Sequence, residues 1–142
     1  MATTNARAIL ESLKTRIEAL TPSDRLGIDD QYRVTIGLRT AHTGARSTLL
    51  TCSPGRRKFE QRTCSDWELM ISIEMFYTAQ QGSYLRAVED QDQIVSDLYE
   101  WTVTDGATLG VLKIEPDMAS ISEPVDGEIL VQRFIRVEYQ GD

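Results

Sequence analysis

The segment from residue 66 to residue 78, DWELMISIEMFYT, constrains the fold of this chain more than any other. Its apolar and polar side chains largely alternate, and alternate side chains of a strand point to opposite faces. The segment therefore predicts a half-buried strand. One face of this strand is formed by Trp67, Leu69, Ile71, Ile73, Met75 and Tyr77. At about 3.3 Å per residue the strand spans roughly 40 Å, so we expect it to cross a whole domain or to protrude and pair with another subunit.

Further segments alternate in the same way and predict more strands of a sheet. They cover residues 31–38, 109–115 and 128–139, and Arg133 interrupts the apolar row of the last one. Residues 39–65 show no sustained period and contain several turn-forming residues. We expect a long loop or β-excursion there, and such stretches in compact domains are usually functional.

Two segments, 4–20 and 84–101, have the three- and four-residue apolar spacing of amphipathic helices. The first is expected to end at Thr21, because the residue before a proline is disfavoured in a helix. The second has a predicted buried stripe of Leu85, Val88, Val95, Leu98 and Trp101, with Ile94 and Tyr99 at its edges. Residues 102–108, rich in Thr, Asp and Gly, predict a turn.

Together these segments predict one α+β domain spanning residues 1–142, in the order α-β-(β)-β-α-β-β. We expect a mostly antiparallel sheet of four or five strands with two helices packed on one face. A chain of 142 residues is long enough to bury such a core without a metal ion or a disulfide.

Charge is unevenly distributed along the chain, whose net charge is −7. Residues 39–62 hold six basic residues and one acidic one, whereas residues 83–142 hold four basic and thirteen acidic ones. The candidate basic loop consists of Arg46, Arg56, Arg57, Lys58 and Arg62. The candidate acidic helix face consists of Glu89, Asp90, Asp92, Asp97 and Glu100, which we expect to be exposed. Opposite charge on two parts of one chain bears on its partners rather than on its fold.

Three interpretations of the basic loop compete. It is a solvated loop, a contact with the acidic surface of another subunit, or a contact with nucleic-acid phosphates. The first two fit the sequence equally well. Nucleic acid fits less well, because Phe59 is the one aromatic residue near the basic side chains and the pI is about 4.7.

The sequence contains no recognisable catalytic, cofactor or metal motif, so we expect neither an enzyme nor a cofactor. The single histidine, His42, has no neighbouring acid to orient it, and Cys52 and Cys64 lack the spacing of a redox motif or a zinc site. The acids of 115–128 do not match a calcium-binding loop. No apolar run or leader pattern suggests a membrane or secreted protein, so we expect assembly in a cytoplasm with reduced thiols.

The order of the elements, with the segments ARAILESLKTRIEAL, DWELMISIEMFY, AVEDQDQIVSDLYEW and GEILVQRFIRVEYQ, resembles one family. It is similar to the tail terminator, or tail completion, proteins of long-tailed bacteriophages, the family of the lambda-type minor tail protein U. The resemblance covers about residues 5–139. It implies a structural virion protein that forms a hexameric ring on the tail tube, stops tail polymerisation and joins the tail to the head-side connector.

The partners implied by this resemblance are further copies of the chain, the tail tube protein and the head–tail connector or neck protein. DNA would only pass through the lumen of the ring, and no membrane is involved. The family pattern contains no catalytic residues, so none is expected. In this reading the basic loop and the acidic helix form two halves of a head-to-tail contact between subunits. A neck or head-completion protein of related fold, and a small nucleic-acid-associated binding module, are the alternatives.

Overall fold

The computed structural model describes residues 2–22, 31–37, 47–57, 66–78, 82–121 and 127–140, with the backbone alone at residues 2–5, 56, 57 and 78. The helices within these ranges are α1 (Ala2–Glu18), α2 (Ser83–Val103) and α3 (Asp105–Thr108). The strands within them are β1 (Arg33–Ile36), β2 (Ser47–Cys52), β3 (Arg56–Arg57), β4 (Asp66–Thr78), β5 (Val111–Ile121) and β6 (Glu128–Gln140).

The strands form one mixed sheet. Five of them lie side by side in the order β1-β2-β4-β6-β5, and the short strand β3 pairs with β4 outside this order. Only β1 and β2 are parallel among the described strand pairs, and the other neighbours are antiparallel. The predicted α+β class is confirmed, as is a mostly antiparallel sheet. Strands β2 and β3 fall inside the expected β-excursion.

Strands β4 and β6 form the centre of the sheet. Each has 13 residues, and they pair without interruption from Asp66 opposite Gln140 to Thr78 opposite Glu128. A strand of this length extends for about 43 Å. The other edge of β4 pairs with β2 and β3, so β4 lies inside the sheet and crosses the domain. This is the first of the two possibilities that the sequence left open for this strand.

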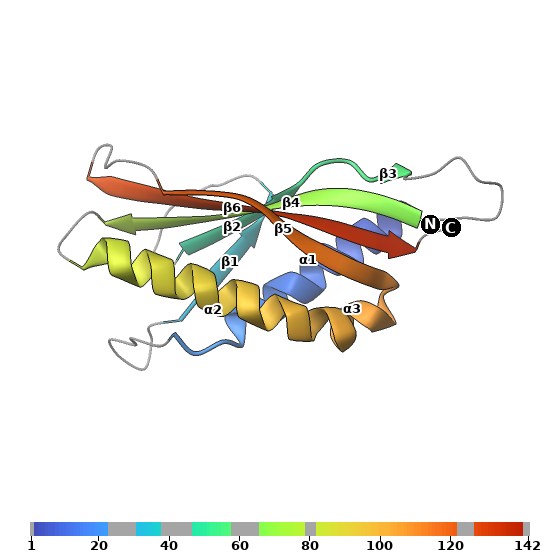
Figure 1. Cartoon of the computed structure of the whole chain (residues 1–142), viewed down its shortest axis with the longest axis horizontal. Helices are drawn as coiled ribbons and strands as arrows, with labels where there is room; N and C mark the ends of the chain where they lie inside the picture. Colours follow the sequence, from blue (N-terminus) through green and yellow to red (C-terminus); the bar gives the residue numbers. More distant parts are fainter. Residues whose placement is uncertain are drawn as a thin grey trace.

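Helices α1 and α2 cover the same face of the sheet (Figure 1). Helix α1 contributes Ile9, Leu13 and Ile17 to the core, which agrees with its predicted apolar face. The sheet contributes the alternate side chains of β4 and β6. These are Leu69, Ile71, Ile73, Met75 and Tyr77 on β4, and Ile129, Val131, Ile135, Val137 and Tyr139 on β6.

The buried side of α2 differs from the predicted stripe. The buried residues of this helix are Ser83, Ala87, Asp90, Gln91, Ile94, Leu98, Trp101 and Thr102. Ile94 therefore belongs to the core rather than to its edge, whereas Leu85 is 68% exposed and Val88 and Val95 are half-buried. The prediction is confirmed for Leu98 and Trp101. It was wrong for the other members because α2 has apolar residues on two sides, and the side that packs on the sheet includes polar residues.

Two further differences occur around the end of α2. The helix continues to Val103, and the segment predicted as a turn contains the short helix α3 (Figure 1). Strand β5 runs past Pro116 to Ile121, although the sequence predicted its end at residue 115. Pro116 is compatible with a strand here because β5 is at the edge of the sheet and its register shifts between Pro116 and Ala119.

Candidate functional site

Asp90 is fully buried, although the sequence assigned it to an exposed acidic face. Its Oδ1 lies 2.9 Å from the hydroxyl of Tyr32, and its Oδ2 accepts a hydrogen bond of 2.6 Å from the hydroxyl of Tyr77. The prediction of an exposed Asp90 is wrong because these hydroxyls offset the cost of burying a carboxyl group. Asp90 therefore joins α2 to the sheet.

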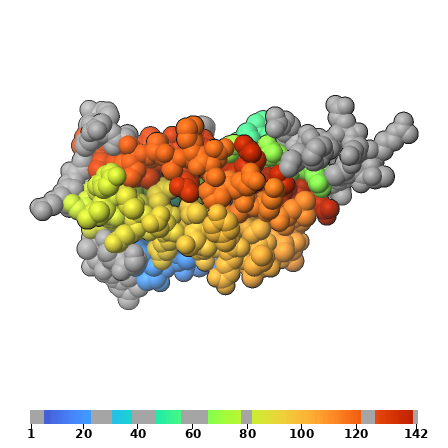
Figure 2. Space-filling model, viewed as in Figure 1, coloured from blue at the N-terminus to red at the C-terminus, as the bar shows by residue number. Residues whose placement is uncertain are grey.

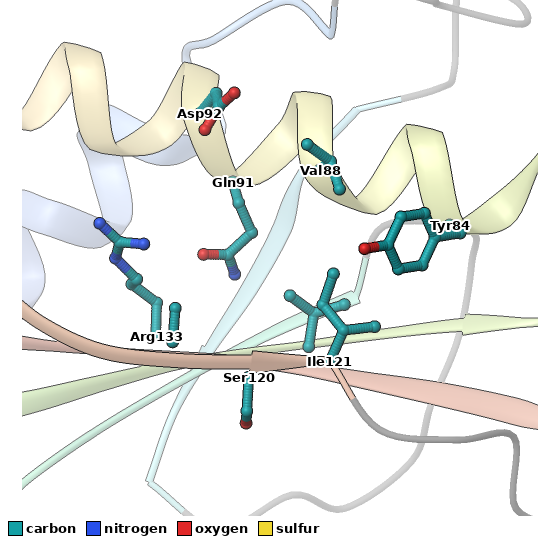
Figure 3. A pocket seen from close by; sticks show the side chains of 9 residues that line it. Tyr84, Val88, Gln91, Asp92, Ser120, Ile121 and Arg133 are labelled. Atoms are coloured by element: carbon teal, nitrogen blue, oxygen red, sulfur yellow. The ribbon is translucent and has the colours of Figure 1, made fainter.

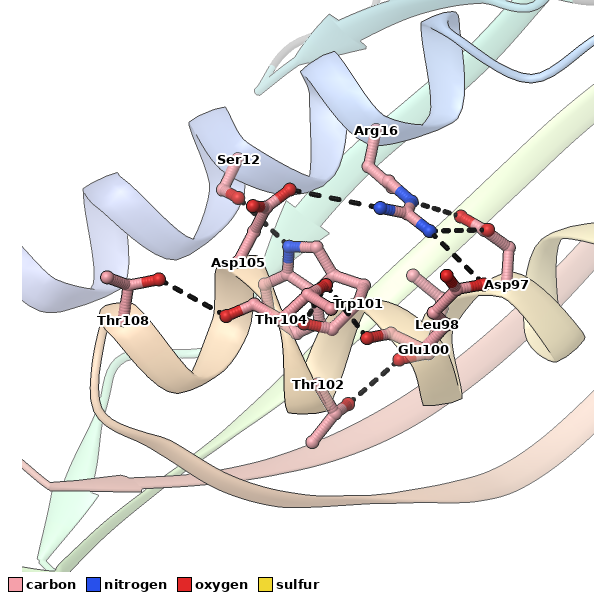
Figure 4. A network of polar contacts seen from close by, with 10 residues as sticks. All are labelled: Ser12, Arg16, Asp97, Leu98, Glu100, Trp101, Thr102, Thr104, Asp105 and Thr108. Atoms are coloured by element: carbon pink, nitrogen blue, oxygen red, sulfur yellow. Dashed lines mark hydrogen bonds and ion pairs between the residues drawn. The ribbon is translucent and has the colours of Figure 1, made fainter.

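Asp97 is also turned inward, where it joins α2 to α1 (Figure 4). Arg16 donates two hydrogen bonds to its carboxylate, from Nε at 2.6 Å and from an Nη at 2.9 Å. The bond to Asp97 raises the pKa of Arg16, and the charges of Glu100 and Asp105 act in the same direction. Since its side chain is only 15% exposed, Asp97 does not lie on an exposed acidic face, contrary to the prediction.

Glu89, Asp92 and Glu100 are the members of the predicted acidic face that the structure leaves exposed. Glu100 also lies 3.7 Å from Arg16, but its side chain remains 70% exposed. The acidic face of α2 is thus reduced from five carboxylates to three.

Of the five predicted members of the basic loop, the structure describes only Arg56 and Arg57, and these by their backbones alone. Arg56 and Arg57 form β3, where their backbones pair with Glu68 and Trp67 of β4. The other predicted members, Arg46, Lys58 and Arg62, lie outside the described residues, as does His42. Whether the basic loop and the acidic face meet in a partner contact therefore stays a prediction.

The large apolar side chains that are exposed gather on two elements. Among the described residues they are Tyr84, Leu85, Tyr99 and Val103 on α2, and Leu112 and Met118 on β5. Helix α2 and β5 lie side by side on the face seen in Figure 2, in yellow and orange. We call these six residues the α2–β5 surface.

The part of the α2–β5 surface that α2 contributes lies on a second apolar side of this helix. Tyr84, Val88, Val95, Tyr99 and Val103 recur at intervals of four or seven residues, which aligns them on one side of the helix. The other apolar side of α2 packs on the sheet and is part of the core. Exposed apolar side chains gathered in this way mark interaction sites in soluble proteins. The sequence did carry the signal, because the predicted stripe of α2 combined residues from both sides.

A cavity of about 370 Å³ opens between α2 and strands β5 and β6 (Figure 3). Its lining from α2 is Tyr84, Val88, Gln91 and Asp92, and its lining from the strands is Ala119, Ser120, Ile121, Val131 and Arg133. Tyr84 belongs to both the cavity and the α2–β5 surface. The cavity is therefore part of the same face of the molecule.

A second cavity, of about 450 Å³, lies beside the segment that precedes β3 and is lined by Cys52, Gly55 and Tyr139, among others. Burial raises the pKa of the Cys52 thiol. Burial also raises the pKa of Tyr139, with a smaller contribution from the charge of Cys52. Such a thiol is a poor nucleophile, because the thiolate is its reactive form.

Neither a protein-family model nor a curated protein matches the sequence. The helices of the described part of the chain include none with the length and apolarity needed to span a membrane. Within the same residues, no three His, Cys, Asp or Glu side chains are grouped so that they could hold a metal ion.

Proposed function

We propose that the chain is a ring-forming structural subunit of a bacteriophage tail, a tail terminator that caps the tail tube and connects it to the head. The ring would be a hexamer located in the virion tail. It would assemble in the host cytoplasm from copies of this chain and bind the tail tube protein on one side and the connector on the other. The chain itself would carry no catalytic site.

The α2–β5 surface is the observation that carries this proposal. Its six apolar side chains are large and 47–74% exposed, and burial of the exposed part of each against a partner would contribute about 1–2 kcal/mol. Exposing these side chains to water does not stabilise a lone domain. In a subunit of a ring, the same side chains would be buried against the neighbouring subunit and would stabilise the assembly.

The charges beside this surface favour a head-to-tail contact. Glu89, Asp92 and Glu100 on α2 are exposed, and the basic residues of the chain are concentrated in residues 39–62. A contact between two different surfaces of identical subunits forms a ring when the rotation closes. In a head-to-tail contact the acidic side chains beside the α2–β5 surface would face basic side chains of the neighbour. In a symmetric contact two acidic surfaces would meet and repel each other, so the symmetric contact is disfavoured.

The order of elements supports the tail-terminator part of the proposal. An N-terminal helix, a long central strand, a second long helix and a final long strand occur in the order of the family that the sequence resembles.

The proposal is tested by placing a charge on the α2–β5 surface. Leu85→Glu removes an apolar contact and forces a carboxylate into the interface, which should weaken self-association at least about 100-fold, equivalent to roughly 3 kcal/mol. Thr15→Glu is the matched control, since Thr15 is exposed on α1, away from this surface. Sedimentation velocity gives the assembly state, and circular dichroism checks the fold.

Two results would contradict the proposal. In the first, Leu85→Glu assembles as well as Thr15→Glu. In the second, the wild-type chain stays monomeric and binds duplex DNA with a steep dependence on salt, as expected for the nucleic-acid-binding alternative.

A further inference from the structure

Arg133 occupies a position where an apolar side chain is expected. It is on the helix-facing side of β6, in line with Val131 and Ile135, which are 1% and 2% exposed. The long side chain is itself half-buried and rises from the sheet toward α2 (Figure 3). A guanidinium keeps its positive charge, and burying such a charge is costly unless it is paired.

The guanidinium of Arg133 has no partner among the residues that the structure describes. Within the described part of the chain its Nε is buried without a hydrogen bond and the group has no ion pair, although Asp92 lines the same cavity. Its neighbours on the adjacent strands are Ala119 and Ile73, which offer no polar side chain. Arg136, on the opposite face of β6, is by contrast paired with Glu115 and Asp117.

The surroundings of Arg133 combine polar and apolar groups. Gln91, only 8% exposed, points into the cavity beside the guanidinium, as Figure 3 shows. Tyr84, Val88 and Ile121 line the other end. Ser120 points away from it, to the other side of the strand. The cavity thus has the guanidinium of Arg133 and the amide of Gln91 at one end and apolar side-chain atoms at the other.

We propose that this cavity binds a carboxylate, supplied by an aspartate or glutamate side chain of a second copy of this chain. A planar carboxylate matches the paired donors of a guanidinium, and the apolar wall fits an aliphatic body. Asp92 at the cavity disfavours a doubly charged phosphate. The chain is rich in acids, with 22 Asp and Glu residues. The identity of the donor rests on the proposed ring, whereas the carboxylate site itself does not.

The first experiment tests the site on the full chain, at a concentration where light scattering gives a monomer. Isovalerate and its neutral analogue isovaleramide are titrated by ligand-observed NMR. We expect isovalerate to bind with a Kd of about 1–10 mM, and isovaleramide at least about tenfold more weakly. Arg133→Gln should weaken isovalerate binding at least about tenfold. Arg136→Gln, on the other face of the same strand, should not.

The site is overturned if the acid and the amide bind equally, if isovalerate does not bind at about 50 mM, or if Arg133→Gln binds it like wild type. Arg133→Met, which keeps the length and apolar fit of the side chain, should show the same loss as Arg133→Gln. This second variant separates loss of the charge from an effect on folding.

The second experiment tests the donor. Arg133→Met should weaken self-association at least about tenfold in sedimentation velocity, and Arg136→Gln should leave it unchanged. If isovalerate binds as expected but Arg133→Met assembles normally, a second copy is not the source of the carboxylate. If the wild-type chain does not self-associate at all, the proposed ring is wrong, and the isovalerate titration still decides on the site.

Discussion

Asp90→Ala is the substitution with the largest expected effect on stability. It removes a fully buried carboxyl group that lies 2.9 Å from the hydroxyl of Tyr32 and 2.6 Å from that of Tyr77. The two tyrosines are 1% and 2% exposed, so water cannot replace the lost partner without opening the core. The hydroxyl of Tyr32 also lies 2.7 Å from the Oε1 of Gln93. Because Gln93 can accept its hydrogen bond when Asp90 is removed, the substitution costs Tyr32 less than it costs Tyr77.

The expected cost follows from the groups left unpaired. A buried hydroxyl without a hydrogen bond costs about 1–3 kcal/mol. Since Tyr77 loses its strong acceptor and Tyr32 keeps Gln93 as an acceptor, we expect Asp90→Ala to lower the free energy of unfolding by about 2–4 kcal/mol. That is a large fraction of the 5–15 kcal/mol typical of a domain.

Asp90→Asn should cost much less, about 1 kcal/mol. An amide oxygen can accept from Tyr77, and an amide nitrogen can donate to Tyr32, which frees the hydroxyl proton of Tyr32 for Gln93. The nearby exposed Asp92 provides the control, and Asp92→Ala should stay within about 0.5 kcal/mol of wild type.

Urea denaturation followed by tryptophan fluorescence, at one protein concentration, measures these differences. The reasoning is refuted if Asp90→Ala is as mild as Asp92→Ala. It is also refuted if Asp90→Asn costs as much as Asp90→Ala, because the hydrogen bonds would then not explain the burial.

Two further predictions concern the second cavity. The raised pKa values of Cys52 and Tyr139 mean that the folded chain keeps protons that the unfolded chain loses, so stability should fall as pH rises above about 9. Cys52→Ser should flatten the first part of this fall in urea titrations at pH 8–10, and an unchanged slope would contradict the assignment. A Cβ at residue 55 would lie 2.5 Å from the Tyr139 hydroxyl, so Gly55→Ala should cost about 1–3 kcal/mol. Tyr139→Phe removes that unpartnered hydroxyl and should recover most of the cost in the double variant, whereas additive losses in the same assay would count against this packing.

Side-chain periodicity predicted the parts of the fold in which one face is apolar and the other polar. The long strand 66–78, the final strand and α1 have such patterns, and the structure confirms each of them. In α2 the pattern was ambiguous, because Leu85 and Val88 compete with Ala87 and Ile94 for the core. Packing on the sheet decides between the two sides, and the sequence of the helix alone does not contain that information.

Polar residues whose partners are distant in sequence account for the errors at the predicted interface. Asp90 is paired with Tyr32, 58 residues away, and Asp97 with Arg16, 81 residues away. The sequence led us to predict that both side chains are exposed, because acidic residues are rarely buried without a partner. For Arg133 the interruption of an apolar row was visible in the sequence, but the cavity above it results from the arrangement of α2 and β5.

Native mass spectrometry of the purified chain shows directly whether the chain associates into a closed ring. Six subunits of 16.0 kDa give a complex of about 96 kDa, and we expect this species to be the largest one, with a population that rises with concentration. A single 16.0 kDa species at every concentration would rule out the proposed ring. So would an open-ended series of masses, because a contact that does not close cannot form a cap on a tail tube.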